Sequence, residues 1–214
     1  MPRSLHSEVW RYLTYSLVHL DLPHLASNLS LQLVVGGLME MRHGPRRVAL
    51  LYLLGVAASS LAYYCFDCNV LLGTSGGVYC LVVSCICTTV LNWREDEVFF
   101  LARFRAGKAP IACGGKLIRI LKLTIIATFV GLDFGLALRR RLVSEDIGVS
   151  VVAHSSGSLA GFLAGFFVLK DEQKDPWEQL WKLVCLSLFL LLLLAALVVN
   201  ITGYRGAVGV FGFM

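Results

Sequence analysis

Six long apolar segments are the feature that most restricts what this chain can fold into. They are Leu22–Met39, Val48–Phe66, Gly73–Trp93, Leu117–Leu138, Gly148–Leu169 and Trp181–Ile201. Each is close to or above the length of about 20 residues with which a helix crosses the hydrocarbon core of a bilayer. Because lipid offers the backbone no hydrogen-bond partners, a helix is the default solution for such a segment. The sequence therefore predicts an all-α polytopic membrane protein, a helical bundle with six transmembrane helices.

Composition agrees with this fold class. Hydrophobic residues make up 57% of the 214 residues, charged residues only 15%, and the mean hydropathy is +0.73. Since a soluble domain has about 45–50% apolar residues, we expect an integral membrane protein with the lipid bilayer as its solvent. The net charge of +5 is interpreted as loop charge. No basic patch is interleaved with aromatic residues, so no nucleic-acid partner is expected.

The distribution of Lys and Arg predicts an orientation. If the first apolar run passes from outside to inside, the cytosolic loops carry about twice as many of these residues as the outer segments. The chain then divides into three parts. Residues 1–21 are an outer loop segment, residues 22–169 a core, and residues 170–214 a cytosolic linker, an extra C-terminal transmembrane helix and a short tail.

Polar side chains inside three of the runs indicate a candidate site. Ser75 lies in a G-x-S-x-G string, His154 in the fifth run, and His24 and Asn28 four residues apart in the first run. Alternate spans start on the same side of the membrane. At 1.5 Å per helical residue, Asn28, Ser75 and His154 each lie roughly 8–10 Å below one face. Ionisable and polar groups inside a membrane are costly and indicate function by default.

Each of these residues also has a structural interpretation. A lone intramembrane serine usually bonds a carbonyl one turn back, and a lone histidine usually makes an interhelical hydrogen bond. His24 and Asn28 could be interfacial groups that reach water. Their coincidence at one depth favours a common site over these separate explanations.

Glycines favour close contact between the two helices that carry Ser75 and His154. Their positions are Gly73, Gly76 and Gly77 beside the serine, and Gly157, Gly161 and Gly165 after the histidine. Small residues at four-residue spacing let neighbouring membrane helices approach closely, which would bring the Ser75 hydroxyl within reach of His154. Tyr79 lies one turn after Ser75 on the same helix face and is placed to support the imidazole ring.

Two other functions use the same residues differently. A soluble α/β-hydrolase would also carry a G-x-S-x-G string, but it needs strands and an acid that reaches the histidine. A transporter would show a midplane ionisable residue. Asp133 is the one acid in a predicted membrane helix between Ser75 and His154, and it is displaced toward the outer end of its run. We expect it to make an interhelical hydrogen bond.

Cysteines predict little chemistry. Cys65 and Cys68, spaced C-x-x-C at the predicted outer end of the second run, could pair in an oxidising compartment or remain reduced. A single such pair is too few for a zinc site. We expect no metal and no organic cofactor.

Several motifs together resemble the rhomboid intramembrane serine proteases, and within them the secretase-type animal rhomboid-related proteins. They are Trp10–Arg11, the set His19, His24 and Asn28, the stretch Gly36–Gly44, G-x-S-G at Gly73–Gly76, and A-H-x-x-G-x-x-x-G at Ala153–Gly161. The resemblance runs from Glu8 to about residue 201 and follows the family's order.

The resemblance implies catalytic roles. Ser75 would be the nucleophile and His154 its general base, a dyad with no acid. His24, Asn28 and the backbone N–H of Ser75 would form the oxyanion hole, and Gly73 would let the loop turn. His19, with Trp10 and Arg11, would belong to a structural first loop.

The resemblance also implies a function. The chain would cleave single-pass membrane proteins near the outer end of their transmembrane helix and release ectodomains, in the secretory pathway or plasma membrane. The alternative is a catalytically impaired rhomboid-like protein that binds or escorts membrane clients. The family's first core helix has no counterpart in these 214 residues. We therefore expect a fragment or shortened isoform with weak activity when expressed alone.

Overall fold

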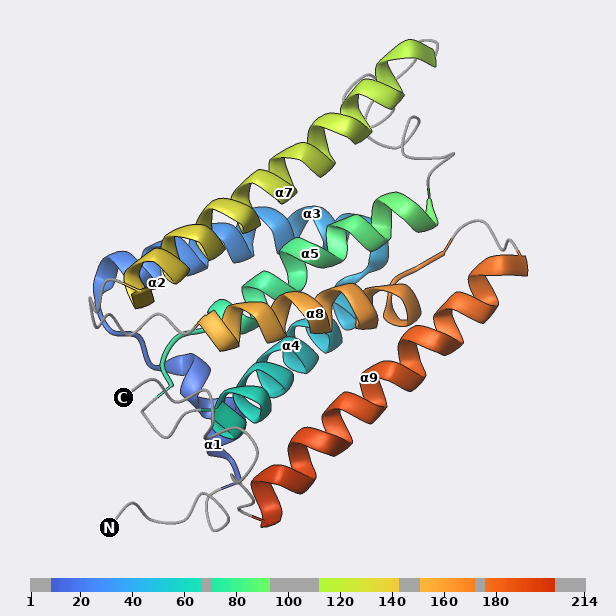
Figure 1. Cartoon of the computed structure of the whole chain (residues 1–214). Coiled ribbons are helices and arrows are strands. Elements are labelled where there is room, and N and C mark those ends of the chain that lie inside the picture. Colours follow the sequence, from blue (N-terminus) through green and yellow to red (C-terminus); the bar gives the residue numbers. More distant parts are fainter. Residues whose placement is uncertain (1–8, 67–70, 93–111, 143–150, 172–175, 203–214) are drawn as a thin grey trace.

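The computed structural model describes residues 9–66, 71–92, 112–142, 151–171 and 176–202, and all regular structure within these ranges is helical (Figure 1). The elements are α1 (Arg11–Thr14), η2 (Tyr15–Leu17), α2 (Leu22–Leu31), η3 (Gln32–Gly36), α3 (Gly37–His43), α4 (Pro45–Phe66), α5 (Ser75–Leu91), α7 (Ala112–Leu142), α8 (Val151–Val168) and α9 (Pro176–Thr202). η2 is a 3₁₀ turn and η3 a π-helical turn. Together α2, η3 and α3 form one nearly continuous helix.

Where the structure describes the predicted apolar runs, they are almost entirely helical, which confirms the fold class of an all-α polytopic membrane protein. Among the described residues, α4, α8 and residues 177–202 of α9 are long and apolar enough to cross a membrane, and α5 is a shorter apolar helix. The domain boundaries proposed at residues 21 and 169 stay predictions.

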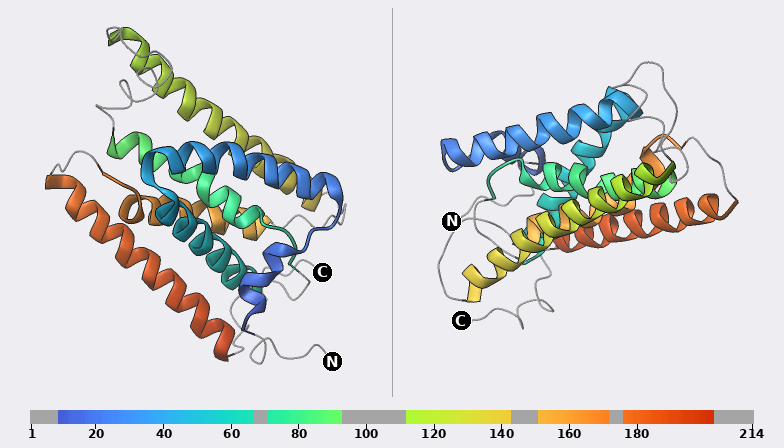
Figure 2. Two further views of the ribbon diagram at one scale, coloured as in Figure 1. Left: turned by 180° about the vertical axis from the view of Figure 1, so that it is seen from behind. Right: turned by 90° about the horizontal axis from the view of Figure 1, so that it is seen from above.

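The helix α5 lies at the centre of the bundle. It packs between α4 and α8, and almost every residue from Ser75 to Ser84 is buried. The helices α7 and α9 flank opposite sides, α7 against α5 and α8, and α9 against α8 and α4 (Figure 2). The leucines of α9, such as Leu191 and Leu194, remain exposed, as expected for a surface that faces lipid.

Glycines allow α8 to lie directly against α5, as the sequence predicts. A Cβ atom added at Gly157 would lie 2.3 Å from the carbonyl oxygen of Gly76, and one at Gly161 would lie 2.2 Å from that of Cys80. The contacts at Gly157 and Gly161 are with backbone atoms that cannot move aside, so larger residues there would separate α8 from α5. Gly76 allows a second close approach, to α4, where an added Cβ would meet the buried Ser59 hydroxyl oxygen at 2.3 Å.

The substitution Gly161→Ala is expected to lower stability by about 1–3 kcal/mol, the usual effect of overpacking a close contact. The measurement is thermal unfolding of the detergent-solubilised chain. The matched control is Gly135→Ala on α7, where an added Cβ meets nothing within 4 Å. Equal melting temperatures for the two variants would contradict the close packing of α8 on α5.

The end of the bundle away from Ser75 is held by a buried histidine. His43, at the end of α3, accepts a hydrogen bond from the backbone N–H of Lys170 at its Nδ1 atom (3.0 Å). Its Nε2 atom lies 3.2 Å from the Thr88 hydroxyl of α5. With Nδ1 as acceptor, Nε2 carries the proton and donates. His43 therefore links α3, α5 and the residues that follow α8.

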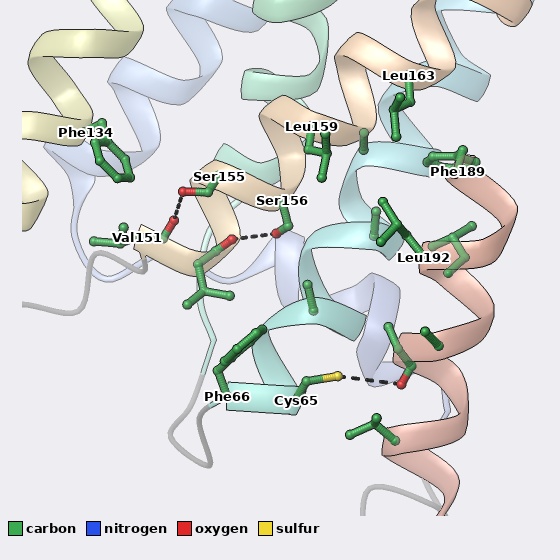
Figure 3. A pocket seen from close by; sticks show the side chains of 18 residues that line it. Cys65, Phe66, Phe134, Val151, Ser155, Ser156, Leu159, Leu163, Phe189 and Leu192 are labelled. Atoms are coloured by element: carbon green, nitrogen blue, oxygen red, sulfur yellow. Dashed lines mark hydrogen bonds between the residues drawn. The ribbon is translucent and has the colours of Figure 1, made fainter. Parts of the chain in front are cut away.

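An apolar groove of about 670 Å³ separates parts of α4, α8 and α9, with Phe134 of α7 at its edge (Figure 3). The hydroxyls of Ser155 and Ser156 line this groove, but they donate to the carbonyls of Val151 and Val152 in their own helix. The wall that remains is apolar, which suits a hydrocarbon chain better than a polar ligand.

Candidate active site

Ser75 is the first residue of α5, and the turn before it requires glycine. Gly73 has a φ of +94°, a conformation that residues with a side chain rarely adopt. A Cβ atom at Gly73 would also lie 2.7 Å from Cε1 of His24. The chain therefore turns sharply beside the His24 ring and enters α5 at Ser75.

The segment before α2 holds this turn in place. The N–H of Gly73 donates to the carbonyl of Val18 (2.7 Å), and the N–H of Thr74 donates to Nε2 of His19 (3.4 Å). The hydroxyl of Thr74 is also hydrogen-bonded to that of Tyr52 on α4. His19 therefore contacts the turn through a hydrogen bond to its backbone, and the structural role that the resemblance implies for it stays a prediction.

That segment is in turn fixed to α4. The buried Tyr15 hydroxyl donates to the carbonyl of Val56 (3.0 Å), and the Ser60 hydroxyl donates to the carbonyl of Tyr12 (2.7 Å). Burial raises the pKa of the Tyr15 hydroxyl far above its usual range, so the group remains a donor. The Ser75 turn is therefore supported by the segment of residues 12–19, which is itself anchored to the bundle.

Ser75 and His154, predicted from separate segments, meet in the structure. The Ser75 Oγ and His154 Nε2 atoms are 2.9 Å apart, a normal hydrogen-bond distance. The serine is buried, and the imidazole side chain is 13% exposed. Tyr79 stacks on the imidazole with ring centroids 4.3 Å apart and an interplanar angle of 15°, which fixes the plane of the ring.

An acid also reaches this pair, whereas the resemblance implies a dyad with no acid, and that implied mechanism stays a prediction. Oδ2 of Asp133, on α7, lies 2.9 Å from Nδ1 of His154. The interhelical hydrogen bond expected of Asp133 is present, and its partner is the histidine of the site. The chain order serine, aspartate, histidine matches that of an α/β-hydrolase, but the described residues form helices only.

The first turns of α2 bring His24 and Asn28 to the same end of the bundle. Asp21 caps this helix by accepting from the His24 N–H (2.7 Å), and the His24 ring lies against the Gly73 turn. Asn28 is 5% exposed, and its Nδ2 atom has no hydrogen-bond partner among the described residues. A buried amide donor without an acceptor is costly, which makes it a candidate donor for a bound group.

Two expectations of the sequence, the absence of a metal and the possible Cys65–Cys68 pair, stay predictions. The described residues contain no group of three or more His, Cys, Asp or Glu side chains placed to hold a metal ion. Cys68 lies outside the described residues, so a Cys65–Cys68 disulfide stays a prediction.

The sequence predicts an interhelical hydrogen bond for Asp133 but does not indicate His154 as its partner. The available signal was that it is the one acid within an otherwise apolar part of its helix. Such an acid needs a partner in a membrane, and His154 was the predicted titratable residue at similar depth. Similar depth makes His154 a candidate partner of Asp133, but depth alone does not decide whether α7 turns the acid toward it.

Fold and site together define a polytopic helical membrane protein that carries a hydrogen-bonded serine–histidine pair with an aspartate behind the histidine. Residues 6–171 match the Rhomboid domain, and the chain belongs to the rhomboid family. It is 33% identical over 187 residues to Rhomboid-related protein 1 of Caenorhabditis elegans, covering 86% of this chain and 47% of that protein. It is 35% identical over 201 residues to Rhomboid-related protein 2 of Mus musculus, covering 91% and 59%.

Another relative has a name that marks it as inactive. Inactive rhomboid-related protein 2 of Caenorhabditis elegans is 28% identical over 195 residues, covering 89% of this chain and 50% of that protein. The chain spans about half the length of the relatives that it matches. Membership of the family therefore leaves catalysis to be argued from the residues of the site.

Proposed function

We propose that this chain is an intramembrane serine endopeptidase. The observation that carries the proposal is the 2.9 Å contact between Ser75 Oγ and His154 Nε2, inside an apolar helical bundle. A serine hydroxyl is a weak nucleophile unless a neighbouring base takes its proton. The buried pair supplies that base at hydrogen-bond distance, with the ring plane held by Tyr79.

In the proposed mechanism His154 Nε2 accepts the Ser75 proton as the hydroxyl oxygen attacks the carbonyl carbon of the scissile peptide bond. The negative charge that develops on the carbonyl oxygen is stabilised by the Ser75 N–H and by donors from His24 and Asn28. His154 then protonates the leaving amine, which departs and leaves an acyl group on Ser75. A water molecule, deprotonated by His154, hydrolyses this ester and restores the serine.

The substrates we propose are single-pass membrane proteins. The site lies at one end of the bundle, so a substrate helix would be cut near its end. A helix hides its carbonyl groups in internal hydrogen bonds, so Gly, Pro or other weak helix formers near the cut would favour local unwinding. With the orientation predicted from loop charges, the cut lies at the outer face and releases the ectodomain in the secretory pathway or at the plasma membrane.

The competing proposal is an impaired family member that binds or escorts membrane clients. The relative named as inactive keeps this alternative open. The intact Ser75–His154 hydrogen bond favours the protease, because a client-binding protein has no need of it.

A fluorophosphonate probe, which reacts with activated serines, separates these two proposals. We expect it to label the membrane-embedded chain at Ser75 and to leave Ser75→Ala unlabelled. The labelled residue is identified by mass spectrometry of the purified protein. A folded wild-type chain that stays unlabelled at Ser75 would favour the client-binding alternative.

A further inference from the structure

We propose that Asp133 is a positioning residue for His154, and that it turns the serine–histidine pair into a three-residue relay of hydrogen bonds. This inference rests on the proposed protease function. Asp133 does not touch Ser75 in the relay; it acts through the imidazole, with its Oδ2 atom 2.9 Å from His154 Nδ1.

The partners of the two ring nitrogens determine the tautomer of His154. A carboxylate can only accept hydrogen bonds, so the nitrogen that faces Asp133 must carry the proton. Nε2 is then unprotonated and presents its lone pair to the Ser75 hydroxyl, 2.9 Å away. In the opposite tautomer Nε2 would donate to Ser75 and could not serve as the base. Asp133 thus selects the tautomer that catalysis requires.

The carboxylate also matches the charge that appears during the reaction. When Ser75 attacks, His154 becomes an imidazolium, and a negative carboxylate in contact with it stabilises that charge in an apolar environment. Asp133 is 34% exposed and His154 13% exposed, so water weakens this effect without removing it. The Tyr79 hydroxyl also hydrogen-bonds to Asp133, which limits rotation of the carboxylate.

The position of Asp133 on α7 supports a dedicated contact. Its neighbours Leu132 and Phe134 are 62% and 46% exposed, so this turn of α7 points mainly outward. If the contact served only to hold α7 against α8, any hydrogen-bonding side chain at this position could make it. Only the catalytic role needs a group that is negative and that cannot donate to Nδ1.

Comparison of Asp133→Asn with Asp133→Glu tests this distinction, with Leu132→Ala as the control on the adjacent residue. The asparagine keeps the size and a hydrogen bond but loses the charge, and its NH₂ group can donate to Nδ1 and favour the wrong tautomer. The glutamate keeps the carboxylate. The readouts are kcat and KM for a single-pass reporter, the rate of fluorophosphonate labelling at Ser75, and the melting temperature.

We expect Asp133→Asn to lower kcat and the labelling rate by about 10²-fold or more, with KM within about twofold of the wild type. Asp133→Glu should have a kcat and a labelling rate at least about tenfold higher than those of Asp133→Asn. Leu132→Ala should behave as the wild type. All rates are compared at a single neutral pH.

Three results would overturn the inference. In the first, Asp133→Asn retains the wild-type kcat and labelling rate. In the second, Asp133→Glu and Asp133→Asn lose activity equally. In the third, the loss of activity follows the loss of melting temperature alone.

The labelling experiment also separates this inference from the proposed function. If wild-type protein is labelled at Ser75 while Asp133→Asn is labelled equally fast, the positioning role fails and the protease proposal stands. If folded wild-type protein neither cleaves nor becomes labelled, both proposals fail. Should Asp133→Asn not fold, Asp133→Glu decides, because a carboxylate variant with kcat as low as that of His154→Ala would contradict the role.

Discussion

Replacing Ser75 or His154 with alanine is expected to reduce cleavage of a single-pass reporter by about 10⁴-fold or more. Without the serine hydroxyl no acyl intermediate can form. Without the imidazole the hydroxyl, which contacts His154 Nε2 at 2.9 Å, loses the base that accepts its proton. Because the two residues act in one step, the double variant should be no worse than either single variant.

The measurement is the release of the reporter ectodomain, using a transmembrane helix weakened by Gly or Pro near the proposed cut. The matched control is Ser155→Ala, next to His154, because that hydroxyl is exposed and donates only to the carbonyl of its own helix. Ser155→Ala should cleave at the wild-type rate. Cleavage by folded Ser75→Ala at a rate near that of the wild type would exclude the proposed nucleophile.

Replacing Asn28 with alanine is expected to lower kcat by about 10²–10³-fold, the usual effect of removing one oxyanion-hole donor. The Asn28 Nδ2 atom is buried and has no partner among the described residues, so losing this donor breaks no hydrogen bond of the Nδ2 group to them. A hydrogen-bond donor that points to the position of the developing negative charge stabilises the transition state more than the ground state. Stability should therefore change little while turnover falls.

The control for Asn28 is Ser27→Ala on the same turn of α2, where the exposed hydroxyl donates to the carbonyl of His24. Both variants are compared by kcat, KM and melting temperature. If Asn28→Ala lowers the melting temperature by many degrees while its folded fraction keeps normal kcat, Asn28 is a structural residue.

Much of the bundle could be predicted because its signals are local. The length of each apolar run determines a helix, and the glycine spacing after His154 indicates which face meets α5. Depth counted along each run then places Ser75 and His154 together. The observed hydrogen bond, the Tyr79 stack and the close approach at Gly157 and Gly161 follow from these features.

The contact of Asp133 could not be predicted in the same way. The helix α7 is apolar on several sides in this region, so its sequence does not determine how it is rotated about its own axis. That rotation decides whether Asp133 meets His154 or another helix. The π-helical turn at Gln32–Gly36 escaped prediction for a related reason: one extra residue in a turn leaves no mark in an apolar pattern.

The most direct test of the central claim is to map the cut made by the purified chain in liposomes that also contain a single-pass reporter. Mass spectrometry of the products identifies the new termini for wild-type and Ser75→Ala protein. The account predicts a wild-type cut at the end of the reporter helix that lies level with Ser75, and no such product with Ser75→Ala. A cut only in the soluble part of the reporter, or the same intramembrane cut by both proteins, would contradict it.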